Sequence, residues 1–259
     1  MDTLTIMILL LSLSIILILI LFYKYNKYKK LHKNKYFLPQ VSASFLSPLF
    51  EVNEYGPMIK SEVSFIGRGD LIVPGGTSDE EAWILAVLAK EAKTMFEFGT
   101  CTGKTTYLWA KNSAVDAKIH TLTLPPDYFE KYSKTDKDDS IAIRNALSES
   151  AFSKFLYSET DVAYKVNQIF SDSKTFDESS LHNKCDLIFI DGSHAYSYIE
   201  SDSEKAFKML KKGGIILWHD YDGVYRNNKD VYSYLNKLSQ KLSLYHVKGT
   251  TFVVFKKEN

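Results

Sequence analysis

Two acidic residues stand directly after long apolar runs, where an unpaired charge is costly. Asp191 follows the run 187–190, and Asp220 follows the run 215–218 with His219 between them. Buried carboxylates are retained when they are paired or when they bind a cation. Two carboxylates brought to one point from neighbouring strands suit a hard divalent cation such as Mg²⁺. Asp191, His219 and Asp220 are therefore the candidate metal ligands.

Two histidines beside these acids have open roles. His219 could complete the metal site, act as a general base near neutral pH, or simply pack, and an imidazole is a weaker ligand for Mg²⁺ than an acid. His194 follows Asp191-Gly-Ser and could be the base instead, or could hold the loop that carries Asp191. The candidate catalytic residues are Asp191, His194 and His219.

A glycine-bracketed loop follows a third apolar run. Gly99 and Gly103 enclose three small residues, and a helix-like segment comes next. This is how a buried strand turns into a helix whose N-terminus faces a ligand. The dinucleotide pattern G-x-G-x-x-G fails because position 101 is Cys, and the P-loop pattern fails because position 98 is Phe. What remains is E-x-G-x-x-x-G, with Glu97 as the acid.

The elements that must position these residues alternate between strand and helix. A capping box at 78–81 opens a largely apolar helix. Further helices are expected from about 104 and over 139–156, 196–210 and 229–240, and strands over 94–98, 118–124, 164–170, 186–190, 215–218, 243–248 and 251–256. This order predicts an α/β fold with a doubly wound, mostly parallel seven-stranded sheet and an antiparallel edge hairpin. Ligands bind such sheets at the carboxyl ends of the strands, where the candidate residues fall.

With these segments in place, the chain from about 75 to 257 resembles class I S-adenosylmethionine (SAM)-dependent methyltransferases. Within them it resembles the bacterial family that includes macrocin O-methyltransferase-like enzymes. The resemblance is carried by FEFGTCTG (96–103), IFSDS (169–173), DLIFIDGSHAY (186–196), GGIILWHDY (213–221) and GTT (249–251). It implies a Rossmann-like fold, SAM as cofactor, methyl transfer, and often a divalent metal that holds the acceptor oxygen.

The resemblance also implies a set of cofactor-binding residues. These are Glu97, Gly99, Thr100, Gly103, Thr123, Asp172, Ser173 and Asp191. Glu97 would hydrogen-bond through the loop or to the amino group of SAM, and Asp172 would lie near the adenine, although it could also merely cap a turn. Thr123 departs from the pattern, because similar proteins often place an acid there to bind both ribose hydroxyls. The acids at 127 and 130 could take its place.

The first 36 residues differ from the rest of the 259-residue chain. The nineteen residues 4–22 carry no charge and would span roughly 28 Å as a helix, close to the hydrocarbon thickness of a bilayer. A cleaved signal peptide would need a basic start and a shorter apolar core, but this chain begins Met-Asp-Thr. Six lysines and no acid lie in 24–36, which places that side of the predicted anchor in the cytoplasm. The expected parts are a transmembrane anchor (1–23), a basic juxtamembrane linker and lid segment (24–76) and a methyltransferase domain (77–259).

Charge and cysteine content limit the partners and the redox state that the chain can be expected to have. The region after the lysines is mildly acidic, which argues against nucleic acid as a partner. Cys101 and Cys185 form no disulfide framework and are expected to be reduced. The sequence therefore predicts a membrane-anchored, metal-assisted SAM-dependent O-methyltransferase. Its acceptor would be a sugar, glycan or other small molecule at the cytoplasmic membrane face.

Two rival functions and the oligomeric state stay open. One rival is a hydroxylase-like enzyme on the same scaffold. The other is a non-catalytic binding protein, for which Thr123 is the best hint. A homo-oligomer is compatible with the sequence, whereas a nicotinamide-dependent dehydrogenase is disfavoured by the glycine spacing.

Overall fold

The computed structural model describes most of the chain as two compact units. The described residues are 3–32 (the side chains only to 29), 38–67, 76–126, 132–133, 135–150, 152–225 and 228–258. The units are Met1–Lys35 and Tyr36–Asn259, and each is described by itself.

The first unit is one apolar helix, α1 (Thr3–His32). Its most apolar 18-residue window, within Thr3–Lys29, has a mean hydropathy of 3.2, and none of that window is buried. A helix that is apolar all round has no polar face to turn to water. By length and composition α1 can cross a membrane, a test that a signal sequence also passes.

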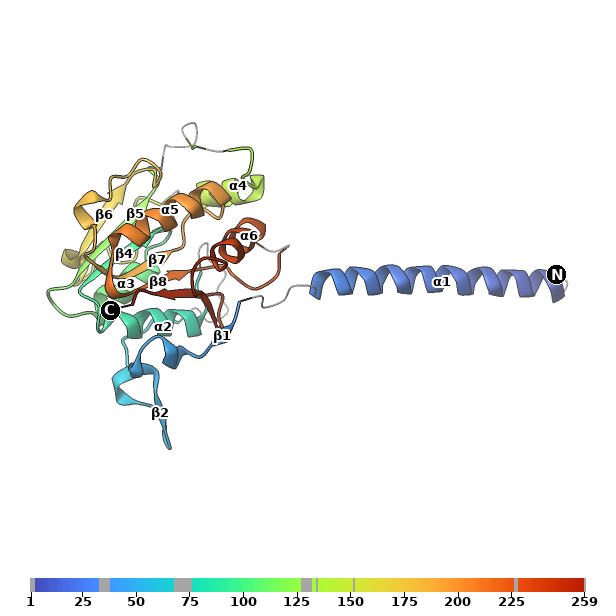
Figure 1. Ribbon diagram of the computed structural model, residues 1–259, viewed down its shortest axis with the longest axis horizontal. Helices are drawn as coiled ribbons and strands as arrows, with labels where there is room; N and C mark the ends of the chain where they lie inside the picture. The colour runs from blue at the N-terminus through green and yellow to red at the C-terminus, as the bar shows by residue number, and fades with distance from the viewer. Residues whose placement is uncertain are drawn as a thin grey trace. The chain divides into compact units, whose positions relative to one another are not determined.

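The second unit is built on an eight-stranded sheet in the order β1-β9-β10-β8-β7-β4-β5-β6 (Figure 1). The strands are β1 (Gln40–Val41), β4 (Thr94–Phe98), β5 (Lys118–Thr123), β6 (Val166–Phe170), β7 (Cys185–Ile190), β8 (Leu210–Trp218), β9 (Tyr245–Val247) and β10 (Val253–Lys256). Strands β6, β5, β4, β7 and β8 run parallel, and β10 is antiparallel to both β8 and β9. This is the Rossmann-like class I methyltransferase fold that the sequence predicts.

The sheet has one strand more than the seven expected. Gln40 and Val41, in a segment expected to be irregular, form β1 and pair in parallel with His246 and Val247 of β9. Two residues are too few to give a periodic signal in the sequence. Strand β1 covers the open edge of β9, so the predicted hairpin β9–β10 does not end the sheet. A separate ribbon, β2 (Val52–Asn53) with β3 (Gly56–Pro57), follows β1 in the chain.

Helices cover both faces of the sheet. They are α2 (Asp79–Ala89), α3 (Lys104–Asn112), α4 (Ser140–Glu149), α5 (Tyr196–Met209) and α6 (Lys229–Leu238), with short 3₁₀ helices η1 (Ala43–Phe45), η2 (Pro48–Phe50), η3 (Ile59–Ser61), η5 (Ala163–Lys165) and η6 (Ser179–Leu181). Alternate side chains of β7 enter two different cores. Leu187 and Phe189 join the core under α2 and α3, whereas Ile188 and Ile190 join the one under α5 and α6. This two-sided burial explains why β7 reads as a continuous apolar run.

Local signals in the sequence set the ends of several elements. Helix α2 begins with the predicted capping box, in which the Glu81 N–H donates to Ser78 Oγ and the Ser78 N–H donates to Glu81 Oε2 at 2.9 Å. Strand β6 begins two residues later than expected because 163–165 form η5. Helix α4 ends at Glu149, earlier than expected, and β8 begins at Leu210 directly after α5.

Candidate active site

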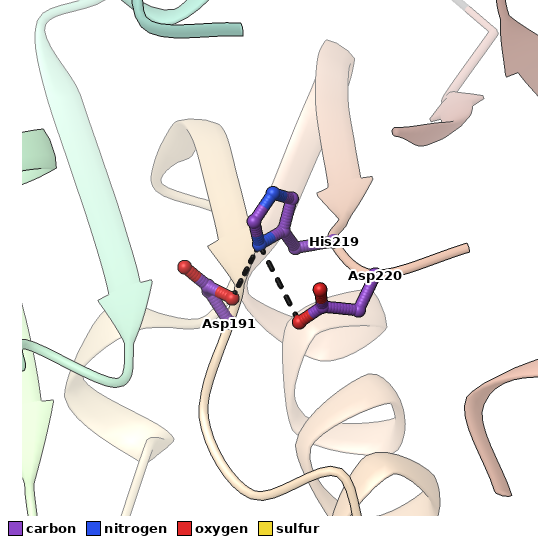
Figure 2. A group of neighbouring side chains, drawn as sticks. All are labelled: Asp191, His219 and Asp220. Atoms are coloured by element: carbon purple, nitrogen blue, oxygen red, sulfur yellow. Dashed lines mark hydrogen bonds and ion pairs between the residues drawn. The ribbon is translucent and has the colours of Figure 1, made fainter. Parts of the chain in front are cut away.

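The carboxyl ends of β7 and β8 bring the predicted metal ligands together. The two strands pair in parallel up to Ile190 and Trp218, and the His219 N–H still donates to the Ile190 carbonyl at 3.1 Å. Asp191, which follows β7, therefore faces the residues that follow β8. Figure 2 shows Asp191 and Asp220 turned toward the same nitrogen of the His219 ring.

Four ionisable side chains surround this point and form what we call the ion-pair cluster: Asp191, His194, His219 and Asp220. His219 Nδ1 lies 2.8 Å from Asp191 Oδ1 and 3.5 Å from Asp220 Oδ2. His194 Nε2 lies 2.8 Å from Asp220 Oδ2. The sequence thus identified all four members, and the structure places them in contact.

The carboxylates control the charge of both imidazoles. Burial disfavours a charged His194, but Asp220 and Asp191 outweigh it and raise its pKa to about 9. For His219, burial is again outweighed, by Asp191 and Asp220, and the pKa lies well above its usual value. His194 therefore holds its second proton at neutral pH, and the neighbouring carboxylates favour the protonated form of His219 as well. A protonated imidazole donates hydrogen bonds and takes no proton from a substrate.

The donor atoms of the cluster fit a divalent cation. One ligand atom each from Asp191, His219 and Asp220 can be chosen so that all lie within 4.8 Å of one another. Two carboxylates and one imidazole form a usual donor set for such ions. Because a ligand nitrogen must be unprotonated, His219 Nδ1 would first lose the proton that it shares with Asp191.

Asp220 adopts a backbone conformation that is uncommon outside glycine, although Asp tolerates it better than most residues. Its φ is 63°, in the left-handed region. The Asp220 N–H donates to Thr251 Oγ1 at 3.2 Å, and Asn228 Nδ2 donates to the Asp220 carbonyl at 3.0 Å. Strained backbone of this kind persists where the surroundings fix it, often at functional sites. The Gly-Thr-Thr segment noted in the sequence thus holds Asp220 in place.

A narrow cavity of about 40 Å³ lies at the carboxyl ends of the central strands. It is lined by Phe98, Gly99, Cys101, Leu122, Thr123, Leu124, Ala146, Glu149, Ser150, Ser171, Ser173, Asp191, Gly192, Ser193, Tyr198 and Asp202. Four predicted cofactor-binding residues are among them: Gly99, Thr123, Ser173 and Asp191. The acids at 127 and 130 lie outside the described residues.

Glu97 lies beneath this cavity instead of lining it. Its carboxylate accepts hydrogen bonds from the hydroxyls of Thr106 and Thr121, the latter at 2.6 Å. Thr100, another predicted cofactor residue that is absent from the lining, bonds to Thr121 Oγ1 at 2.7 Å. Burial raises the pKa of Glu97 to about 8. In the structure Glu97 therefore braces the loop and the first turn of α3.

The two glycines of the loop serve close packing. Gly99 has φ +95°, and a Cβ there would come 2.1 Å from the carbonyl oxygen of Asp191. Gly103 has φ +80°, and a Cβ there would press on Phe155 and Tyr157. Gly99 thus allows the loop to approach the cluster, while Gly103 lies against a neighbouring loop and does not line the cavity.

Asp172 is engaged inside the protein. It accepts hydrogen bonds from the Tyr198 hydroxyl and the Lys174 N–H, both at 2.9 Å. This matches the alternative of a turn cap, with an added contact to α5. Asp172 does not line the described cavity, but the next residue, Ser173, does.

Three acids near the cavities escaped the sequence analysis as functional candidates. Glu149, at the end of α4, lines the cavity, and burial raises its pKa to about 7. Asp202 lies on the buried face of α5, also lines the cavity, and has no partner for Oδ1 among the described residues. An acid at a core position of a helical pattern was the signal for Asp202. Glu81 was interpreted only as part of a capping box, yet its Oε2 lies 3.4 Å from His219 Nε2.

A second, smaller cavity of about 10 Å³ lies at the ion-pair cluster, with room for about one water molecule or ion. Asp191, His194, His219 and Asp220 line it. The segment 191–193 borders both cavities, so it separates the larger space from the cluster.

Comparisons with known proteins agree with a methyltransferase domain. Residues 96–221 match a protein family described as a methyltransferase domain. No curated protein matches the chain. The narrower resemblance to macrocin O-methyltransferase-like enzymes stays a prediction.

Solved structures give three examples of similar chains. An O-methyltransferase from Streptomyces achromogenes, involved in tomaymycin synthesis and solved with SAM, is 17% identical over 74% of this chain and 83% of that one, with a TM-score of 0.48. An SAH-bound methyltransferase from Podospora anserina is 16% identical over 71% and 80%, with a TM-score of 0.49. A SAM-dependent O-methyltransferase from Thermotoga maritima is 15% identical over 74% and 68%, with a TM-score of 0.46. These identities are too low to transfer a substrate.

Proposed function

We propose that the chain is a SAM-dependent methyltransferase that methylates a hydroxyl group of a sugar, glycan or other small molecule with the help of a divalent cation. The observation that carries the proposal is the shared wall of the two cavities at 191–193. SAM in the larger cavity and an acceptor at the ion-pair cluster would meet across Asp191. The family match over 96–221 supports the reaction class.

The residues of the chain would mainly position the two reactants. Methyl transfer is an in-line displacement, so correct alignment supplies much of the rate. Gly99 and Ser173 would border SAM, and Asp191, His219 and Asp220 would hold the cation, for which the sequence suggests Mg²⁺. When bound, a divalent cation favours the ionised form of a nearby hydroxyl.

The acceptor hydroxyl must also lose its proton. In the proposed reaction His219 is a ligand of the cation and is not free to act as a base, and His194 beside Asp220 has a pKa of about 9 without the cation. Glu149 borders the larger cavity with a pKa of about 7, which suits a general base at neutral pH. Glu149 is therefore the proposed base, which requires the acceptor hydroxyl to reach the larger cavity past the 191–193 wall.

The proposed location of the enzyme rests on helix α1. An uncleaved anchor followed by lysines would keep the catalytic unit on the cytoplasmic membrane face, where SAM is available. An enzyme held there would act on lipid-borne or membrane-proximal acceptors. Equal activity of the membrane-bound enzyme on free and lipid-linked sugars would count against this part.

Calorimetric titration of SAM into the full-length protein in detergent micelles tests the cofactor. We expect micromolar binding that weakens in Asp191→Ala and persists in Asp177→Asn, which changes an exposed acid. Transfer of a labelled methyl group from SAM to membrane extracts then tests the reaction. SAM binding without methyl transfer would favour the hydroxylase-like rival, and no SAM binding would favour the non-catalytic binding protein.

A further inference from the structure

Glu81 makes several contacts at the edge of the ion-pair cluster. Its Oε2 lies 3.4 Å from His219 Nε2. The same oxygen accepts hydrogen bonds from the Ser78 N–H at 2.9 Å and the Ser78 hydroxyl at 2.8 Å. Its Oε1 accepts from the Thr251 N–H at 2.7 Å and the Thr251 hydroxyl at 2.8 Å. Both oxygens of this buried carboxylate are therefore fixed in place.

The His219 ring is also fixed by its apolar neighbours. Its centroid lies 5.7 Å from the ring of Phe189 and 5.5 Å from that of Phe252. The His219 side chain is only 9% exposed. This packing fixes the plane of the ring, and the polar contacts set its orientation, with Nε2 toward Glu81 and Nδ1 toward Asp191 and Asp220.

This orientation decides which nitrogen can bind a cation. A histidine that binds a metal almost always donates its other ring N–H to a carboxylate, a carbonyl or water. Once a cation takes the lone pair of Nδ1, the one ring proton of His219 is on Nε2, where it faces Glu81 Oε2 at 3.4 Å. The arrangement is that of a carboxylate–histidine–metal triad.

We infer that Glu81 is a positioning residue that makes His219 Nδ1 a metal ligand, so that the site takes a divalent transition metal in preference to Mg²⁺. The inference rests on the metal site of the proposed function and names the class of its cation. Imidazole nitrogen suits iron, nickel and zinc, whereas Mg²⁺ prefers oxygen ligands. Replacing His219 by an acid would restore an all-oxygen set at the same place.

The first experiment detects the nitrogen ligand directly. Full-length protein in detergent is loaded with Mn²⁺ and SAM, and pulsed electron paramagnetic resonance records coupling of the Mn²⁺ electrons to ¹⁴N. We expect a ¹⁴N signal in the wild type and its loss in His219→Asp. Mn²⁺ bound in the wild type without ¹⁴N coupling would overturn the inference.

The second experiment measures Co²⁺ and Mg²⁺ affinity by calorimetry in Glu81→Gln. Glutamine can still complete the capping box, so helix α2 keeps its start. We expect Co²⁺ affinity to fall by about 10- to 100-fold, as for other partners of metal-bound histidines. The matched control is Glu80→Gln, which changes an exposed acid one residue away and should leave Co²⁺ affinity unchanged. Equal Co²⁺ affinity in Glu81→Gln and the wild type would overturn the positioning role.

A third variant tests the metal preference and separates this inference from the proposed function. His219→Asp should lower the ratio of Co²⁺ to Mg²⁺ affinity at least about tenfold. An unchanged ratio would overturn the preference. If no divalent cation binds the SAM-loaded wild type, the inference fails, and the proposed reaction no longer includes a metal. Retained SAM binding in the same samples would still support the methyltransferase.

Discussion

Gly99 and Asp191 are in such close contact that a single added carbon would force them apart. A Cβ on Gly99 would come 2.1 Å from the Asp191 carbonyl oxygen and 2.7 Å from Gly192 Cα. The Asp191 N–H donates to the Phe98 carbonyl at 2.9 Å, which holds the two segments at this separation. The glycine loop and the ion-pair cluster are thus one packed unit.

We therefore expect Gly99→Ala to destabilise the protein by at least about 2 kcal/mol, because it adds a backbone clash to a left-handed φ. Chemical denaturation measures the loss. Gly192→Ala is the matched control: a Cβ there meets its nearest neighbours at 3.6 Å, an ordinary contact, so stability should change little. Equal stability of the two variants would contradict the packing described here.

Glu97 should make the stability of the fold depend on pH. Its pKa is about 8 in the folded protein and about 4.5 when unfolded, so between these values the folded state holds a proton that the unfolded state has lost. Stability should therefore fall as pH rises from about 4.5 to about 8 and stay level above that. The penalty at pH 7 is of the order of 3 kcal/mol.

Glu97→Gln removes this titration, and its oxygen can still accept from Thr106 and Thr121. We expect the free energy of unfolding of this variant to fall less between pH 5 and pH 8 than that of the wild type. Urea denaturation across that range checks the slope. Glu62→Gln, which changes an exposed acid, should keep the wild-type slope. A wild-type slope in Glu97→Gln would show that Glu97 is ionised when folded.

The position of Glu97 also shows what the sequence could predict and what it could not. Its strand was predicted correctly because four consecutive buried positions, three of them apolar, end the five-residue strand. The alternation of the strand places Glu97 with Met95, on the face under α2 and α3, and opposite to Phe96 and Phe98. A prediction based on that alternation would have turned the carboxylate toward α3. That Thr106 of α3 is its hydrogen-bond partner there can be seen only in the folded structure.

The ion-pair cluster was predictable because its acids follow the two longest apolar strands. The partners of the cluster were not. Glu81 is 138 positions before His219, and its local role as a helix cap gives a complete explanation of the residue without any tertiary contact. Asp172 shows the same limit, since only the fold brings the Tyr198 hydroxyl to its carboxylate. Strand β1 is too short for any pattern.

Thr123 gives a prediction about cofactor affinity under the proposed function. It lines the larger cavity at the end of β5, where an acid would accept hydrogen bonds from both ribose hydroxyls of SAM. Hydrogen bonds to a charged group contribute about 1.5–3 kcal/mol each. We expect Thr123→Asp to bind SAM about tenfold more tightly in calorimetry. Thr123→Asn is the uncharged control, and an equal gain in both variants would show that charge is not the cause.

Asp220 should set the protonation of His194. The 2.8 Å contact between Asp220 Oδ2 and His194 Nε2 helps to raise the pKa of His194 to about 9 against the effect of burial. Asn, like Asp, tolerates a left-handed backbone, so Asp220→Asn removes the charge without changing the backbone conformation. We expect the pKa of His194 to fall by at least about one unit, as the loss of an adjacent opposite charge requires.

Nuclear magnetic resonance of the imidazole protons in protein without added metal measures this pKa. His120 is the internal control: it lies in β5, which does not neighbour β7 or β8 in the sheet, and its pKa, lowered by burial, should be the same in both proteins. A His194 that still titrates near pH 9 in Asp220→Asn would show that Asp191 and Glu149, and not Asp220, keep it protonated.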